Sequence, residues 1–361
     1  MKRGPVSKVV FFVAGVLAPF ASLACGGGGA PATTGPIDAP AGQWTWVPFP
    51  DAFCADGSTT GIGINLGAAG SRPLIYLEGG GACWSEDTCY TLMLAANFTT
   101  GYSKASFTAD AAGATGLAEP GGFFDRQAAD NPFRDWSYVY VPYCTGDVHA
   151  GDNVVQYGAH TAKHVGFANF AAYLKRLVPT FAAADRVVLA GSSAGGVGAV
   201  FNWWPTQQAF GSVRVDLIDD SGPLMPADVV SEGGGFEAME RVQWNLAATV
   251  PPGCTACGSD LSTMFGFYAQ AFPTHRGALL SYTQDSVIPI FYGISTAEFT
   301  TGLDEMLAAQ FAPSTNLRSF LDGAVGHVLW FTPTLSSSTV TVKQFVTQMV
   351  TDDTAWTDVH P

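Results

Sequence analysis

Charged residues are scarce in this chain of 361 residues, and basic ones are the scarcest. Only 13% of the residues are charged, and 16 Lys and Arg stand against 30 Asp and Glu, which gives a formal net charge of −14. A chain this acidic offers no basic surface to the phosphate backbone of a nucleic acid, so we expect no nucleic-acid partner. We also expect a monomer.

The hydrophobic run at the N-terminus, residues 9–24, is too short to cross a bilayer. It follows Lys2, Arg3 and Lys8, an arrangement typical of a secretory signal peptide, which we assign to residues 1–24. Cys25 and the four glycines after it resemble the start of a bacterial lipoprotein with a lipid anchor on Cys25. We therefore expect an extracellular or periplasmic protein attached to a bacterial outer membrane. Free secretion is the alternative, because Ser22 stands where lipoprotein signals usually have Leu.

Residues 26–42 consist almost entirely of Gly, Ala, Pro and Thr. This composition predicts a flexible linker over residues 25–43, with ordered structure beginning near Trp44. The rest, residues 44–361, is expected to form one catalytic domain.

Six cysteines remain after Cys25, an even number that suits an oxidising compartment. We predict three disulfides and no free thiol among them. The short spacings favour Cys83–Cys89 and Cys254–Cys257, which leaves Cys54–Cys144. Cys254 and Cys257 could instead be a redox or metal motif, but no second Cys pair or nearby His accompanies them.

Expected strands alternate with expected helices along the chain, which predicts an α/β fold with a mostly parallel central sheet and helices on both faces. An antiparallel hairpin is expected near residues 54–66, and a surface insertion around the mouth of the site over residues 97–130. The other expected strands are 73–77, 136–143, 187–190, 213–218 and 277–282. The expected helices are 167–177, 297–311 and 340–350.

A candidate nucleophile lies in Gly191-Ser192-Ser193-Ala194-Gly195, between a short apolar run and the start of a helix. A Gly-x-Ser-x-Gly sequence in a strand-turn-helix setting places the central serine on a sharp turn above a sheet, with its hydroxyl exposed. We assign Ser193 as the nucleophile and expect Ser192 to point elsewhere.

A serine hydroxyl needs a histidine base held by an acid, and after this type of turn the acid and then the histidine follow in the chain. Among the histidines that follow Ser193, His327 lies in a Gly-flanked position after the last strand, so we assign it as the base. Asp285, at the end of the preceding strand, is the favoured acid. Asp220 is the alternative, because it also follows a strand end.

The oxyanion of the tetrahedral intermediate needs backbone N–H donors, and glycines let the backbone approach it closely. Gly79-Gly80-Gly81 follows a buried strand, and Ala194 follows the nucleophile. We expect Gly80, Gly81 and Ala194 to form the oxyanion hole.

Four motifs together resemble the pectin acetylesterase family, which includes the Notum carboxylesterases of animals. In order, they are Leu77-Glu78-Gly79-Gly80-Gly81-Ala82-Cys83-Trp84, Tyr143-Cys144-Thr145-Gly146-Asp147-Val148-His149, the nucleophile sequence, and Asp220-Ser221-Gly222. The resemblance implies an α/β-hydrolase fold and a Ser193, Asp285, His327 triad, with no cofactor. Asp147 and His149 are expected to brace a loop or contact substrate, and a metal site formed with Asp152 is the alternative.

The sequence therefore predicts a secreted serine carboxylesterase that removes acetyl groups from a polysaccharide such as pectin. Alternatives are a lipid or protein deacylase, a polyester hydrolase, and a non-catalytic glycan-binding surface lipoprotein. Residues 101–124 and 222–240 are the expected pocket walls. Because Gly, Ala, Ser and acidic residues dominate them, we expect a shallow, polar mouth that suits short acyl groups.

Overall fold

The computed structural model describes residues 34–361 apart from 69–71, 114–115 and 233–235. The signal peptide and Cys25 lie outside the described residues. Contacts divide the chain into two units, residues 1–31 and 32–361, and the description that follows concerns the second.

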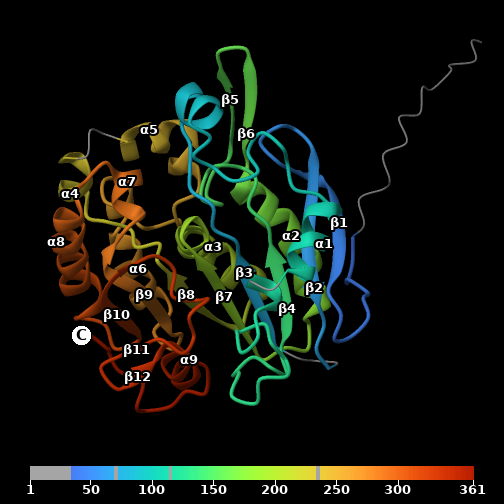
Figure 1. Ribbon diagram of the computed structural model, residues 1–361, viewed down its shortest axis with the longest axis vertical. Helices are drawn as coiled ribbons and strands as arrows, with labels where there is room; N and C mark the ends of the chain where they lie inside the picture. Colours follow the sequence, from blue (N-terminus) through green and yellow to red (C-terminus); the bar gives the residue numbers. More distant parts are fainter. Residues whose placement is uncertain (1–33, 69–71, 114–115, 233–235) are drawn as a thin grey trace, which may run out of the picture. The chain divides into compact units, whose positions relative to one another are not determined.

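A central eight-stranded sheet has the strand order β1-β2-β4-β3-β7-β8-β9-β10 (Figure 1). Strands β1 and β2 form an antiparallel hairpin, β2 also pairs antiparallel with β4, and the strands from β4 to β10 are all parallel. The mostly parallel sheet predicted from the sequence is thus confirmed. The strands are Thr45–Phe53 (β1), Thr59–Asn65 (β2), Pro73–Leu77 (β3), Ser137–Val141 (β4), Arg186–Ser192 (β7), Arg214–Asp220 (β8), Gly277–Asp285 (β9) and Leu317–Gly326 (β10).

Side chains on the central strands alternate between two hydrophobic cores, one on each face of the sheet. In β3, Ile75 and Leu77 enter one core while Leu74 and Tyr76 enter the other. This period of two explains why the run is apolar throughout, since strands of a parallel sheet are buried on both faces.

Helices cover both faces. Residues of α2, α3, α6 and α8 pack in the first core, and residues of α1 and α9 pack in the second. The helices are Lys104–Ala112 (α1), Gly166–Thr180 (α2), Ala194–Phe210 (α3), Ala227–Glu232 (α4), Phe236–Gln243 (α5), Thr263–Ala271 (α6), Ile288–Tyr292 (α7), Thr296–Met306 (α8) and Val342–Val350 (α9). No helix of the described chain is long and apolar enough to cross a membrane.

Three features differ from the sequence-based expectations. Packing begins before Trp44, because Ile37 is only 5% exposed and its N–H donates to Thr180 Oγ1 at 2.7 Å. The expected insertion over residues 97–130 includes α1 and buries three phenylalanines, Phe107, Phe123 and Phe124, in the second core. An unpredicted antiparallel hairpin joins β5 (Asn153–Tyr157) to β6 (His160–His164).

The three predicted disulfides are all present: Cys54–Cys144, Cys83–Cys89 and Cys254–Cys257. Cys54–Cys144 joins residues 90 positions apart, linking the β1–β2 hairpin to the loop after β4. Closing a loop of that length removes conformational entropy from the unfolded chain, which stabilises the fold by about 4 kcal/mol in the chain-entropy view.

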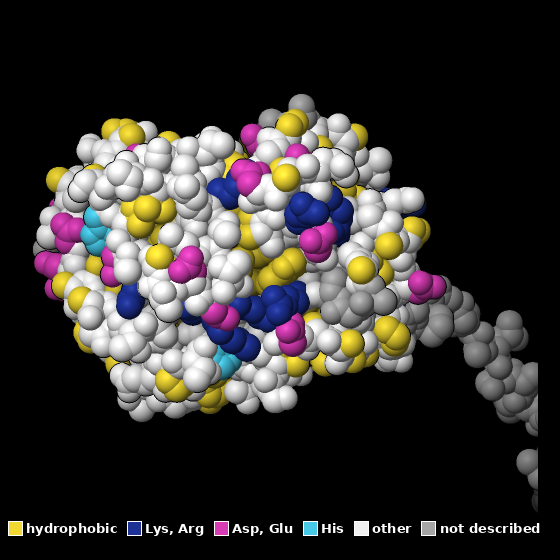
Figure 2. All heavy atoms as spheres, turned by 90° about the horizontal axis from the view of Figure 1, so that it is seen from below, with side chains coloured by type: hydrophobic (Ala, Val, Ile, Leu, Met, Phe, Trp, Pro, Cys, Tyr) yellow, Lys and Arg dark blue, Asp and Glu magenta, His cyan; other side chains and the backbone are white. Residues whose placement is uncertain are grey.

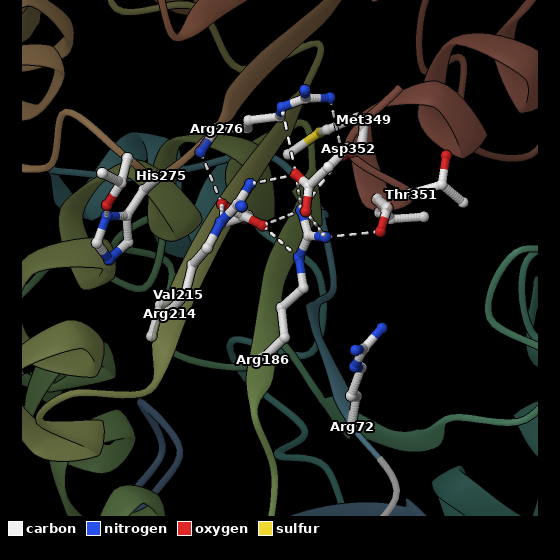
Figure 3. Close-up of polar contacts among 12 residues, drawn as sticks. Arg72, Arg186, Arg214, Val215, His275, Arg276, Met349, Thr351 and Asp352 are labelled. Carbon is white, nitrogen blue, oxygen red and sulfur yellow. Dashed lines mark hydrogen bonds and ion pairs between the residues drawn. The ribbon is translucent and has the colours of Figure 1, made fainter. Parts of the chain in front are cut away.

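Arginines gather at the N-terminal ends of the parallel strands. Figure 2 shows Lys and Arg side chains collected on one face, with Asp and Glu side chains among them. In Figure 3, Arg186, Arg214 and Arg276 converge on Asp352, which follows α9, with N–O distances of 3.1, 2.9 and 3.5 Å. Arg186 also donates to Asp216 Oδ2 at 2.6 Å, and both side chains are buried. The ion pairs of this cluster link the end of α9 to β7, β8 and β9.

Replacing Asp216 with Asn should lower the free energy of unfolding by about 3 kcal/mol, because a buried arginine would lose its carboxylate partner. Urea denaturation followed by circular dichroism measures this loss. Asp185→Asn is the matched control, since the Arg72–Asp185 pair has side chains that are 40% and 70% exposed. That variant should lose less than about 1 kcal/mol. Equal losses in the two variants would contradict the role assigned to the buried pair.

Candidate active site

Ser193 sits on the turn between β7 and α3 with φ 56° and ψ −122°. A non-glycine residue in this region is strained by about 1–3 kcal/mol and persists only where its surroundings fix it. Here the Ser193 N–H donates to Asp220 O at 2.7 Å, and Ser193 O accepts from Gly196 N at 2.8 Å. The sharp turn predicted from Gly-x-Ser-x-Gly is therefore present.

The two glycines of the motif allow the turn to form. A Cβ on Gly191 would lie 2.0 Å from Gly195 O, and a Cβ on Gly195 would lie 2.0 Å from Leu77 O. Neither contact is sterically allowed, so only glycine lets β7, α3 and the end of β3 approach this closely.

The two adjacent serines have different environments. Ser192 Oγ donates to Asp220 Oδ2 at 2.7 Å and accepts from Tyr76 Oη at 2.9 Å, so it belongs to a buried network. Ser193 makes no side-chain hydrogen bond within the described chain, is 7% exposed and borders two cavities. This contrast supports Ser193, rather than Ser192, as the candidate nucleophile.

His327 directly follows β10, and Asp285 ends the neighbouring strand β9. His327 Nδ1 lies 2.8 Å from Asp285 Oδ2. The other carboxylate oxygen accepts from Val287 N and Ile288 N at 2.8 and 2.9 Å. Asp285 thus orients the ring as the acid of a triad would, with Nε2 left for a substrate or nucleophile.

The alternative acid, Asp220, touches the loop after His327 rather than the ring. Its Oδ1 accepts from Leu329 N at 2.8 Å, and its Oδ2 accepts from Trp330 N at 3.0 Å. Burial raises the pKa of Asp220, although these hydrogen bonds and the one from Ser192 oppose the shift. The adjacent Ser221 Oγ accepts from Val328 N, so both residues hold the loop in place.

Ser193 and His327 line the same cleft, although no hydrogen bond joins Ser193 Oγ to the imidazole within the described chain. Catalytic hydrogen bonds are often long without substrate and shorten in the complex, so this missing bond does not argue against the assignment of the two residues as nucleophile and base.

The expected oxyanion donors surround Ser193. Gly80 and Gly81 have φ values of 150° and 77°, and a Cβ on Gly81 would lie 2.0 Å from Leu94 O. Their N–H groups bond to no other group of the described chain. Ala194 is the first residue of α3, where a helix leaves its N–H unpaired. Gly81 and Ala194 border the same cavity as Ser193.

Asp147 and His149 brace the loop after β4. Asp147 accepts from Thr145 Oγ1 at 2.6 Å and from Gly166 N at 2.7 Å. His149 Nε2 donates to Glu78 O at 2.8 Å, and burial lowers the pKa of His149 to about 4. No group of three metal-binding side chains is found within the described residues. The observed contacts thus agree with the loop-bracing role.

Two cavities meet at Ser193. The histidine cleft is lined by His327, Glu78, Asp110, Tyr140 and Gly80, and has a volume of about 540 Å³. The apolar pocket has a volume of about 60 Å³, and His327 does not line it. Its apolar side chains are Val148, Val197, Phe201, Leu224, Trp244, Leu246, Leu261, Ile288, Phe291 and Tyr292.

The expected shallow, polar mouth describes only part of the site, because an apolar pocket lies beside the cleft. Residues 101–124 and 222–240 do contribute to the two cavities, but most apolar side chains of the pocket come from segments outside these ranges. Since each segment adds only one to three side chains, no contiguous apolar run marks the pocket in the sequence.

Sequence reasoning also missed the four acidic residues that line these cavities, Glu78, Asp110, Glu237 and Glu240. Glu78 lines the histidine cleft, and burial raises its pKa to about 7 despite a 2.8 Å hydrogen bond from Tyr143 N. Its place at the end of a buried strand was an available signal. Glu237 and Glu240 of α5 line the apolar pocket, and nothing in their short polar helix distinguishes them from surface acids.

Comparison with known proteins gives a family match and two similar relatives. Residues 45–274, more than half of the chain, match the family model for pectinacetylesterase. Palmitoleoyl-protein carboxylesterase notum2 of Xenopus laevis is 32% identical over 152 residues, which are 41% of this chain and 29% of that relative. Palmitoleoyl-protein carboxylesterase notum1 of the same species is 31% identical over 189 residues, or 51% of this chain and 34% of that relative. The aligned segments thus span about a third of these curated relatives.

Replacing Asp285 with Asn should lower kcat on p-nitrophenyl acetate by about 10³–10⁴-fold, because the imidazole would lose the carboxylate that orients it. Asp220→Asn removes a carboxylate of equal size that bonds to the loop instead, so it should lower kcat much less while also lowering Tm. Steady-state kinetics and thermal unfolding of both variants measure these effects. A larger loss of kcat at Asp220 would reverse the assignment of the acid.

Proposed function

The chain belongs to the pectinacetylesterase family, a family of carboxylesterases, and from this premise we propose that it hydrolyses carboxylic esters through Ser193. The observation that carries the proposal is the position of Ser193. It occupies a strained turn where two cavities meet, and one of these cavities holds His327 bonded to Asp285.

In the proposed acylation step, Ser193 Oγ attacks the ester carbonyl carbon and its proton passes to His327 Nε2. The carbonyl oxygen becomes an oxyanion that accepts hydrogen bonds from the N–H groups of Gly80, Gly81 and Ala194. Losing one such donor typically costs about 3 kcal/mol of transition-state stabilisation. When the carbonyl reforms, the ester C–O bond breaks and the alcohol leaves with the proton from His327.

In the deacylation step, His327 takes a proton from water as the water oxygen attacks the acyl-enzyme carbonyl. The second tetrahedral intermediate collapses, and Ser193 Oγ leaves with that proton. One ester and one water thus become one acid and one alcohol, and no cofactor enters the reaction.

In this proposal, one cavity binds the alcohol part of the ester and the other binds its acyl part. The leaving alcohol must receive its proton from His327, which lines only the histidine cleft, so the alcohol lies there. The acyl group then extends from Ser193 into the apolar pocket. The apolar pocket, about 60 Å³, is much smaller than the histidine cleft, about 540 Å³, which suits a short acyl group.

We propose a short acyl group on a carbohydrate as the substrate class, with the acetyl ester as its smallest member. The wider, polar cleft supports a carbohydrate alcohol, since Glu78, Asp110 and Tyr140 offer acceptors and donors to sugar hydroxyls. Carboxylates in the cleft favour an uncharged sugar over a sugar acid, because like charges repel.

Deacylation of a longer acyl group is the second candidate. The apolar side chains around the pocket favour it, and the two Xenopus relatives are named palmitoleoyl-protein carboxylesterases. The small volume of the pocket favours the short chain.

We place the protein outside the cytoplasm, lipid-anchored at Cys25. The three disulfides support this location, because disulfides persist in oxidising compartments.

Ser193→Ala should lower turnover of p-nitrophenyl acetate by about 10⁶-fold in kcat, as loss of a serine nucleophile does elsewhere. Tm should stay nearly unchanged, because the strained backbone is kept. Ser192→Ala is the control and should retain turnover. A fluorophosphonate should label Ser193 in the wild type, and a wild type that neither reacts with it nor hydrolyses esters would favour the non-catalytic glycan-binding alternative.

Chain length separates the two candidate substrates. On p-nitrophenyl esters with acyl chains of two to sixteen carbons, kcat/KM should be highest for the short chains, because the apolar pocket is the smaller of the two cavities. A peak at eight or more carbons would instead support the deacylase.

A further inference from the structure

One acidic side chain in the apolar pocket has no protein partner. Glu240 is 8% exposed, and its carboxyl group makes no hydrogen bond or ion pair with the described chain. Because no other group of the described chain bonds to this carboxyl group, it is open to a ligand in the pocket. The catalytic steps proposed above do not use Glu240.

The Glu240 side chain faces the pocket. Glu237, Glu240 and Trp244 all line it, and they lie at spacings of three and four residues along and just beyond α5. Residues at these spacings share one face of a helix. Val242, on another face of the same helix, is 69% exposed.

The neighbouring cation, Arg241, bonds to other groups through Nε and Nη1, while its Nη2 has no hydrogen-bond partner in the described chain. Arg241 Nε donates to Glu237 Oε1 at 2.7 Å, and Arg241 Nη1 donates to the backbone oxygens of Cys257 and Gly258. Burial, with the negative charge of Glu237 nearby, raises the pKa of Glu240 well above its usual value. The shift favours the neutral form of this carboxyl group, which both donates and accepts a hydrogen bond.

We propose that Glu240 recognises a hydroxyl group on the acyl chain, so that the esters of hydroxy acids are the preferred substrates. This inference rests on the proposed function, in which the acyl group occupies the apolar pocket. A hydroxyl group is the complementary partner, because it also both donates and accepts. An unsubstituted chain would displace water from the pocket and leave the Glu240 carboxyl group without a hydrogen-bond partner. Binding of an unsubstituted acyl chain is therefore disfavoured.

A hydroxyl group suits the pocket better than an ammonium group does. An ammonium ion would need a carboxylate at Glu240, and it would have to lose its water shell inside a wall of apolar side chains. The ion pair of Glu237 with Arg241 leaves no second carboxylate free to compensate it.

The test compares ethyl hexanoate with its 3-, 5- and 6-hydroxy derivatives and with ethyl 6-aminohexanoate, by titration of the acid released. For the wild type, at least one hydroxy ester should exceed ethyl hexanoate in kcat/KM by about 10–100-fold. Glu240→Leu should remove that preference and raise Tm, because an apolar side chain replaces an unpaired buried acid. Glu240→Gln, whose amide still donates and accepts hydrogen bonds, should keep part of the preference for the hydroxy ester. The control Val242→Ala should leave the preference unchanged.

Several results would overturn the inference. They are equal kcat/KM for hydroxylated and plain esters in the wild type, a preference that survives Glu240→Leu, and a preference for the amino ester. These results would leave the proposed function intact, provided that the wild type hydrolyses the esters and Ser193→Ala does not. A wild type inactive on every ester would overturn both proposals.

Discussion

The strained backbone of Ser193 is the constraint on which the rest of the structure depends. A positive φ at this serine requires β7, α3 and the end of β3 to meet almost in backbone contact, which Gly191 and Gly195 allow. These strands are fully buried, with a hydrophobic core on each face of the sheet. The two cavities, the Gly80-Gly81 loop and the first turn of α3 then converge on one hydroxyl group, so the geometry of the site follows from the packing of the sheet.

Asp220 connects the two halves of the candidate triad without contacting either reacting group. One carboxylate oxygen accepts from Ser192, beside the nucleophile, and the two oxygens together accept from the backbone of Leu329 and Trp330, beside the base. The nucleophile turn and the histidine loop are thus bonded to a single rigid group at the end of β8. Such bonds fix the relative positions of the two loops, which a catalytic constellation requires to within a fraction of an ångström.

The central sheet, the three disulfides and the positions of Ser193 and His327 were predictable, because strand ends, chain order and cysteine spacing are local properties of a sequence. Asp285 was favoured over Asp220 from the sequence, but both aspartates follow parallel strands, and only coordinates show that Asp285 bonds to the imidazole while Asp220 bonds to the loop after it. The apolar pocket could not be recognised in the sequence, because many short segments contribute to its wall. The place of Glu240 in the pocket could not be predicted from the sequence, because an acidic residue in a short polar helix resembles a solvent-exposed one.

The meeting of two cavities at one serine has a consequence for the order of events. Under the proposed assignment, acid and alcohol occupy separate spaces, so the alcohol can depart while the acyl group is still attached to Ser193. Water then reaches the acyl-enzyme through the space that the alcohol has vacated, beside His327. An alcohol that lingers in the histidine cleft would exclude that water and would itself be positioned to attack. The residence time of the alcohol, rather than the chemistry of the triad, would therefore set the balance between hydrolysis and transfer of the acyl group to a new acceptor.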